Sequence, residues 1–234
     1  MAISEVQQPL NKLLRHLPRK DFALIAPHLD RREFHLRCEI ERPHAPVAEV
    51  VFIETGLVSV IAGKIPGPWM QVGMTGAEGM TGTGIVLGAT HTTTTTLVVV
   101  AATGFTIACS SLLSAMLRST SLRDYLMLYV QAFHAQTISA ALASQHRVEA
   151  RLARELLMMH DRVNGPLGIT HEMLSTMLGT TRPYLTEMLS KLEDGQVIDT
   201  KRGEITILDR NALVKLANGS YGSAEAEYRR LLLA

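Results

Sequence analysis

Residues 170–192, THEMLSTMLGTTRPYLTEMLSKL, decide the fold of the C-terminal half of this chain. Apolar residues recur at helical spacing on both sides of Gly179, which predicts two short amphipathic helices joined by a tight turn. The residues expected on the buried faces are Met173, Leu174, Met177 and Leu178 in the first helix, and Leu185, Met188, Leu189 and Leu192 in the second. A DNA-binding helix-turn-helix requires such a pair, since one helix braces the other against a groove. The stretch therefore favours a gene regulator over an enzyme.

Two alternating segments follow this helix pair, on either side of Lys201-Arg202-Gly203. They predict a β-hairpin. Helix, helix and hairpin in this order form a winged helix-turn-helix. Residues 211–217 are predicted to be a short closing helix, and the role of the tail from Asn218 onward is not readable.

Residues 32–107, upstream, are typical of a β-domain. Residues 49–61, EVVFIETGLVSVI, are rich in β-branched residues and are interrupted by a turn signal at Thr55-Gly56. Residues 69–74 and 93–100 are two further predicted strands. Short strands at this spacing predict a small β-sandwich or barrel. Ahead of them, residues 5–30 are expected to be helical, with a break at Pro18.

A helical pattern runs from Ser110 to about His160, and a new helix near residues 146–149 would open the next domain. Within the pattern, a nearly heptad stripe marks one side of a long helix. The stripe consists of Leu122, Tyr125, Tyr129, Ala132, Gln136, Ser139 and Ala143. A long helix with such a stripe usually pairs with a copy of itself, so these residues are the predicted homodimer interface. The alternative is a helix packed on its own β-domain.

The composition is that of a globular protein with a buried core. The chain has 234 residues, of which 47% are hydrophobic and 19% are charged, enough for one large domain or two small ones. Residues 147–234 carry twelve Lys and Arg and twelve Asp and Glu, so the helix-turn-helix half lacks the basic excess common in DNA-binding domains. This balance argues mildly against DNA binding, although a neutral domain can still carry a local basic patch.

Several function classes find no support in the sequence. Cys38 and Cys109 are far apart, so they indicate neither a zinc site nor an iron–sulfur cluster, and we expect structural thiols in a reducing compartment. Nine scattered His without ligand spacing predict no metal site and are weak evidence for haem. No catalytic motif is found, so no enzyme is expected. The most apolar run, residues 97–102, is far shorter than a membrane span, which favours a cytoplasmic protein with no membrane partner.

The polar face of the second helix carries the chemistry that suits a DNA groove. Thr181 is the predicted N-cap, with Arg182 and Pro183 in the first turn. Arg182 suits a guanine edge and Glu187 suits the N4 amino group of cytosine. The candidate DNA contacts are Thr170, His171, Thr181, Arg182, Pro183, Tyr184, Thr186, Glu187, Ser190 and Lys191, with Lys201 and Arg202 at the tip of the wing. The alternative is the solvated surface of an ordinary helical hairpin, which the hairpin and the long helix disfavour.

Residues 147–208 resemble the DNA-binding domain of the Crp/Fnr family of bacterial transcription regulators. The resemblance is carried by Ile169-Thr170 before the first helix, Leu178-Gly179 between the helices, Arg182 opening the second, and Leu192-Glu193 before the wing. The upstream β-rich region and long helix are similar to that family as well. The resemblance implies an α+β fold. Its parts are a cyclic-nucleotide-binding-like β jelly roll in residues 1–118, a dimerisation helix in 119–146 and a winged helix-turn-helix in 147–234.

The resemblance also implies partners, namely double-stranded DNA and a second copy of the chain, with RNA polymerase as a further candidate. The family's recognition helix often reads Arg-Glu-x-x-x-Arg. Arg182 keeps the first position, whereas Pro183 replaces the Glu and Glu187 replaces the second Arg. The usual base contacts therefore do not all carry over to this chain.

The β-domain departs from the family in the same way. Members that bind cyclic nucleotides hold the ribose with a Gly-Glu pair and the phosphate with a following Arg. Here Thr83 follows Gly82, and no Arg occurs in residues 65–117. A buried phosphate without a cation is costly, so cyclic AMP is not the expected ligand and no cofactor is predicted. The candidate contacts of an unidentified effector are Glu78, Gly82, Thr83, Thr93 and Thr94, although a turn or a salt bridge is the simpler role for Glu78.

Two other readings of the chain stay open. A regulator without an effector is one of them. The other is an effector-binding or protein-interaction module that uses the helix pair for docking and does not bind DNA in a sequence-specific way. Salt dependence separates the last reading from a DNA-binding regulator, since DNA binding weakens steeply as salt rises.

Overall fold

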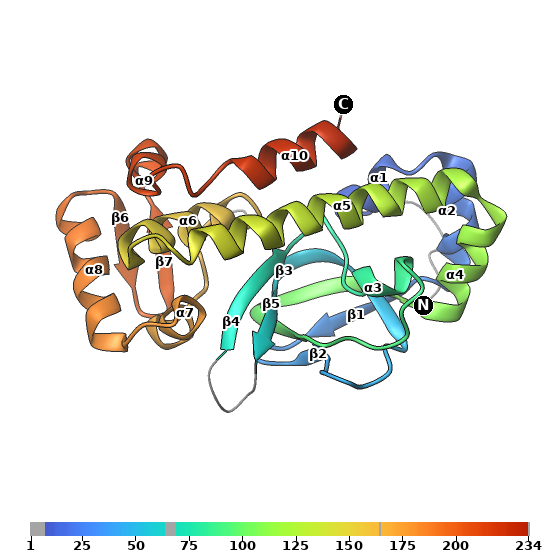
Figure 1. The fold of residues 1–234 in the computed structure, drawn as a ribbon, viewed down its shortest axis with the longest axis horizontal. Helices are drawn as coiled ribbons and strands as arrows, with labels where there is room; N and C mark the ends of the chain where they lie inside the picture. The colour runs from blue at the N-terminus through green and yellow to red at the C-terminus, as the bar shows by residue number, and fades with distance from the viewer. Residues whose placement is uncertain (1–7, 64–68, 164, 234) are drawn as a thin grey trace.

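The computed structural model describes residues 8–63, 69–163 and 165–233, and its elements are arranged as Figure 1 shows. Residues 5–7 of the predicted N-terminal helical stretch lie outside this part. The helices are α1 (Lys12–His16), α2 (Arg19–Ile25), a 3-10 turn η1 (Ala26–His28), α3 (Thr83–Val86), α4 (Cys109–Arg118), α5 (Thr120–Ala143), α6 (Val148–His160), α7 (His171–Leu178), α8 (Arg182–Asp194), α9 (Arg210–Leu216) and α10 (Ser223–Leu232). The strands are β1 (Asp30–Phe34), β2 (Glu39–Glu41), β3 (Glu49–Gly63), β4 (Trp69–Thr75), β5 (Thr95–Ala108), β6 (Ile198–Lys201) and β7 (Glu204–Ile207).

The β-domain is built on one antiparallel sheet in the order β1-β5-β3-β4, with β2 also paired to β5. The prediction of a turn at Thr55-Gly56 is wrong. Strand β3 continues through these two residues, with shifts in its register against β5. Gly56 has a φ of +78°, and a Cβ atom there would lie 2.2 Å from the Ala101 carbonyl oxygen. The glycine therefore marks a β-bulge, which lets one long strand bend without ending.

Strand β5 is longer than its predicted span of residues 93–100. Its second half contains Ala101 and Gly104, which are poor strand formers on their own. That half pairs with β3 on one side and with β1 on the other, including Gly104 opposite both Ile53 and Arg32. Hydrogen bonding to β1 and β3 therefore extends the strand. Local strand propensity carries no information about these two partners.

The helical pattern predicted from Ser110 to His160 forms three helices, α4, α5 and α6. The first break is at Ser119, the N-cap of α5, whose hydroxyl accepts from the Leu122 amide at 3.3 Å. The hydroxyls of Ser119 and Ser121 donate to the Asp21 carboxylate at 2.6 and 2.7 Å. These contacts attach the start of α5 to α2, and α5 then crosses the whole β-domain (Figure 1).

The predicted dimer stripe faces the chain's own core, which corrects the interface prediction. Tyr129 illustrates the reason, because its hydroxyl accepts from the Met80 amide and donates to the Met80 carbonyl, both at 3.0 Å. Gln136 accepts from the Met74 amide at 2.5 Å. Of the rest of the stripe, Leu122, Ala132, Ser139 and Ala143 are buried and Tyr125 is half-buried. The alternative weighed for this helix, packing on its own β-domain, is the arrangement observed.

The tail from Asn218 onward, whose role could not be predicted, contains α10, which packs back along α5 (Figure 1). The Tyr228 hydroxyl donates to the Glu78 carbonyl at 2.7 Å. Leu232 is buried in the same apolar cluster as Leu13 and Leu126, far upstream in the chain. The C-terminal segment is thus part of the core of the β-domain and its helices.

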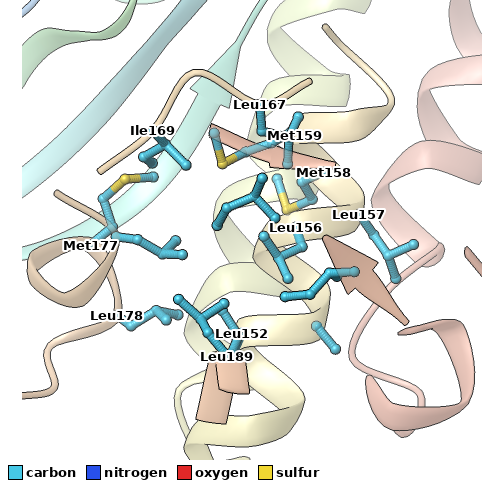
Figure 2. Packing of buried hydrophobic residues seen from close by; sticks show 14 of the residues in the cluster. Leu152, Leu156, Leu157, Met158, Met159, Leu167, Ile169, Met177, Leu178 and Leu189 are labelled. Carbon is cyan, nitrogen blue, oxygen red and sulfur yellow. The ribbon is translucent and has the colours of Figure 1, made fainter. Parts of the chain in front are cut away.

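The predicted fold class is confirmed, with a β-domain, a long helix and a winged helix-turn-helix in that order. A single apolar cluster joins the β-domain to the C-terminal half, since Leu57 and Met74 of the sheet belong to the cluster built on α6. Figure 2 shows the α6 side of this cluster, where Leu156 and Met159 lie among residues of the helix-turn-helix. No helix in the described ranges is long and apolar enough to cross a membrane.

Candidate nucleic-acid interface

Helices α7 and α8 form the predicted pair, and local contacts fix their ends. The Thr170 hydroxyl caps α7 by accepting from the Met173 amide at 3.2 Å. Gly179 ends α7 with a φ of +62°, a left-handed conformation that glycine adopts readily. Thr181 is the N-cap of α8 by position, but its side chain makes no capping hydrogen bond. The turn thus depends on Gly179 more than on the second cap.

The polar side of α8 is open to solvent. Leu185, Met188 and Leu189 are buried on the opposite side, where they join the core cluster. The predicted contacts on the helix are all exposed, namely Arg182, Pro183, Tyr184, Thr186, Glu187, Ser190 and Lys191. Thr170 and Thr181 are exposed as well, and His171 is half-buried. The structure thus brings the candidate residues of the helix pair to one accessible region, which a groove-binding helix requires.

Some of these residues are engaged within the chain. The Lys191 ammonium lies 2.7 Å from the Glu187 carboxylate one turn away. His171 Nδ1 lies 3.2 Å from the Thr186 hydroxyl, which links the two helices. By contrast, Arg182 makes no ion pair with any residue that the structure describes. Arg182 is therefore the cation on this face that is free to meet a base or a phosphate.

Tyr184 is held by a residue that the sequence did not single out. Its hydroxyl donates to Glu149 at 2.9 Å, which connects α8 to the first turn of α6. The pKa of Glu149 is lowered, first by a hydrogen bond to the backbone amide of Glu149 itself and then by the Tyr184 hydroxyl. An acidic residue in the first turn of a helix is a recognisable signal, but its pairing with Tyr184 depends on tertiary structure.

The wing is a tight hairpin of β6 and β7 that turns at Arg202-Gly203, with Gly203 at a φ of +78°. Lys201 and Arg202 are both exposed at its tip, and Lys201 lies 3.6 Å from Asp199. Ile205 exchanges two backbone hydrogen bonds with Leu167, at 2.8 and 3.0 Å. The wing is therefore fixed to the segment between α6 and α7, beside the helix pair.

Buried polar contacts connect this interface to the β-domain. Glu155 of α6 accepts from the Gln71 side-chain amide of β4 at 2.7 Å, and Gln71 in turn accepts from Ser59 of β3 at 2.6 Å. Arg162 donates to Glu78 at 2.6 Å. Glu78, a candidate effector contact, is thus committed to an ion pair, the simpler role weighed for it. These contacts link the β-domain directly to α6 and to Arg162 just beyond it.

A cavity of about 220 Å³ lies in the β-domain, between the sheet and α5. Gly82, Thr83 and Thr94 line it, as expected of effector contacts, whereas Thr93 is exposed and does not. Glu41 also lines the cavity, although the sequence did not indicate it as a candidate contact. The alternation Glu39-Ile40-Glu41 placed both acids on one strand face, with no signal that one of them would be buried.

Comparison with known proteins matches the C-terminal half to a family model and the fold to solved structures. The model of the Crp-like helix-turn-helix domain matches residues 150–216. Among solved structures, FixK2 from Bradyrhizobium japonicum superposes with a TM-score of 0.67 at 17% identity, over 80% of this chain and 96% of that one. The c-di-GMP responsive global regulator CLP of Xanthomonas campestris gives 0.61 at 18% identity, over 81% and 99%. TTHB099 from Thermus thermophilus, a transcriptional regulator of the CRP family, gives 0.59 at 19% identity, over 82% and 99%.

No curated protein matches the chain in sequence. The solved structures therefore establish the fold, and the family model identifies the helix-turn-helix within it. Together they confirm the resemblance drawn from residues 147–208.

Proposed function

We propose that this protein, which carries a Crp-like helix-turn-helix domain on the fold of Crp/Fnr regulators, is a DNA-binding transcription regulator. It acts as a homodimer on near-palindromic sites and is not regulated by cyclic AMP. The observation that carries the proposal is the exposed polar face of α8, with Arg182 unpaired among the described residues. Because α8 lies in a matched helix-turn-helix, it is the recognition helix. Arg182 then reads a base edge, and Lys201 and Arg202 contact the phosphate backbone.

The homodimer uses the outward face of α5 in place of the predicted stripe. Exposed apolar residues lie along that face at helical spacing, namely Met127, Leu128, Ile138 and Leu142. An apolar stripe on a long helix is buried when a second copy pairs with it. Two recognition helices would then enter successive major grooves about 34 Å apart, so the expected target site is near-palindromic.

The cavity of the β-domain supports the proposed independence from cyclic AMP. Of the described residues that line it, none is Lys or Arg. A cyclic phosphate buried there would lack a cationic partner and would face Glu41, so its transfer from water would be unfavourable.

The direct test is selection of bound sites from random DNA, followed by titration of the selected site with the wild type and with Arg182→Ala. Loss of a bidentate base contact should weaken specific binding by about 1–3 kcal/mol, or roughly fivefold to 150-fold. Arg118→Ala, an exposed arginine at the end of α4, is the matched control and should bind as the wild type does. Equal affinity of Arg182→Ala and wild type would refute the role given to α8.

A second function, a protein-docking module, is favoured by one observation. Lys191 and Lys201 are both paired with acids, so the surface is less basic than its residue count suggests. Repeating the titration at 50 and 200 mM salt separates the two functions, because a DNA complex loses orders of magnitude in affinity through counterion release. If the affinity for a selected DNA site does not change with salt, the protein-docking function is favoured.

A further inference from the structure

The cavity of the β-domain has a wall of mixed character. Val58, Val60 and Val72 of the sheet form its apolar floor, and Phe133 and Thr137 of α5 close it from the other side. Between them, the segment around Gly82 and the threonines of the run before β5 contribute hydroxyl and backbone groups. Its volume of about 220 Å³ is below the range of about 300–1,000 Å³ usual for drug-sized ligands, so it suits a small molecule.

Glu41 is the exceptional residue of this wall. The side chain is only 9% exposed, and one carboxylate oxygen, Oε2, accepts from the Thr96 hydroxyl at 2.5 Å. The other oxygen, Oε1, is buried and accepts no hydrogen bond of regular geometry from the described residues, although the Gly82 amide and the Thr81 hydroxyl lie close enough to the carboxylate to oppose the rise in its pKa. No other buried side-chain nitrogen or oxygen in the described part of the chain is left unpaired in this way. Since an unsatisfied buried carboxylate oxygen is costly, its position requires an explanation.

The charge of the wall indicates what kind of group would satisfy Oε1. His91 is the only other titratable side chain among the described lining residues, and it is exposed and bonded to Thr90 at 2.8 Å. No Lys or Arg lines the described cavity. An anionic ligand would therefore meet Glu41 without compensation. A cation would pair with Glu41, and the surrounding hydroxyls could accept its remaining hydrogens.

We propose that this cavity binds a small organic cation, a protonated amine on a short apolar body, with Glu41 Oε1 as the acceptor. The apolar body lies against the valines of the sheet and against Phe133. Because Phe133 and Thr137 belong to α5, an occupant touches the helix on whose outer face the proposed dimer forms. The regulatory role of the ligand rests on the proposed function, whereas the binding itself does not.

Binding is tested without DNA, so that its failure is distinct from failure of the proposed function. The probes are 3-methylbutylamine, 3-methylbutanol and 3-methylbutanoate, which share one apolar body and carry a cationic, a neutral and an anionic head. Isothermal titration at pH 8 should show the amine binding at least tenfold more tightly than the alcohol, with no binding of the acid. The amine is protonated at this pH, because the pKa of an alkylammonium is about 10.

The matched variant is Glu41→Gln, which keeps the shape of the side chain and removes its charge. It should lose at least tenfold in amine affinity while affinity for the alcohol is unchanged. Circular dichroism checks that the variant is folded, and if it is not, the comparison of the three probes on the wild type decides alone. Equal binding of amine and alcohol, or no binding by 3-methylbutylamine and 2-phenylethylamine at 10 mM, would overturn the proposal and leave Oε1 as a site for water only.

Discussion

Arg162, just beyond the end of α6, donates from Nε to Oε1 of Glu78 at 2.6 Å, so an ion pair joins the C-terminal half to the glycine-rich segment of the β-domain. Both side chains are largely buried, with 9% and 13% of their surfaces exposed. Burial by itself lowers the pKa of Arg162, but the charges of Glu78 and Glu225 outweigh it and raise that pKa. The Arg162 guanidinium therefore stays charged, and its contact with Glu78 holds the two halves in one arrangement.

Glu78→Ala should destabilise the protein strongly, because it leaves the Arg162 charge buried without its partner. The expected loss in the free energy of unfolding is about 3–5 kcal/mol, measured by denaturation in urea. The control is Asp124→Ala, which breaks the exposed pair with Arg123 and should cost about 0–1 kcal/mol. Similar values for the two variants would show that the Glu78–Arg162 pair does not support the arrangement.

Gly56→Ala should destabilise the β-domain through both backbone strain and a steric clash. The φ of +78° is unfavourable for alanine, and the new Cβ would lie 2.2 Å from a backbone oxygen of β5. Gly88→Ala is the matched control, since Gly88 also has a positive φ, of +90°, but nothing lies within 4 Å of a Cβ there. The control should cost about 1–3 kcal/mol from strain alone, and Gly56→Ala should cost clearly more. Equal shifts in thermal midpoint would contradict the bulge as a site of close approach.

Ile138→Asp should convert the proposed dimer into a monomer without unfolding it. Ile138 is 51% exposed on the outward face of α5, so a charge there is harmless in the monomer but is buried in the dimer. Sedimentation velocity at micromolar concentration measures the change. Leu117→Asp, at an 89% exposed leucine on α4, is the control and should leave the dimer intact. A monomeric wild type, or a dimer that survives Ile138→Asp, would move the interface away from this face.

Stability should depend on pH through Glu41. Burial raises the pKa of its carboxyl, against the opposing effects of Thr96, Gly82 and Thr81. The folded state therefore binds the proton more tightly than the unfolded state, and stability falls as pH rises from the ordinary glutamate pKa through the raised one. Glu41→Gln should remove the fall in stability over this pH range. At a pH above the raised pKa of Glu41, the variant should be more stable than the wild type.

The other ionisable groups near Glu41 titrate elsewhere or are exposed. The Cys109 thiol has its pKa raised, first by burial and then by the charge of Glu41, so it stays protonated in this range. His91 lines the same cavity and is exposed. Urea denaturation between pH 4 and 8 measures the profile, and an unchanged slope in the variant would show that Glu41 does not titrate as expected. The same ionisation should strengthen amine binding as pH rises, because the ammonium group pairs with the carboxylate.

The helix pair and the wing could be predicted because their signals are local. Helical spacing around Gly179 and the turn at Gly203 are each contained within a few residues. The stripe from Leu122 to Ala143 shows the limit of such signals. Periodicity identified residues that share one face, but it could not say whether a second copy or the chain's own sheet covers that face.

The cavity of the β-domain shows the same limit. Gly82 and Thr83 could be placed near a ligand through the family resemblance, whereas the burial of Glu41 depends on β2 pairing with a strand more than fifty residues away. The return of α10 onto α5 could not be predicted either, because it depends on distant partners such as the Glu78 carbonyl.

The position of α10 bears on how the chain reaches its native state. Leu232 lies in one apolar cluster with Leu13, so that cluster is complete only after residue 232 has been synthesised. Until then, the growing chain carries a β-domain whose surface still awaits Tyr228 and Leu232. Folding of the first half is thus coupled in time to the synthesis of α10, and the chain cannot reach its full stability one domain at a time while it is being made.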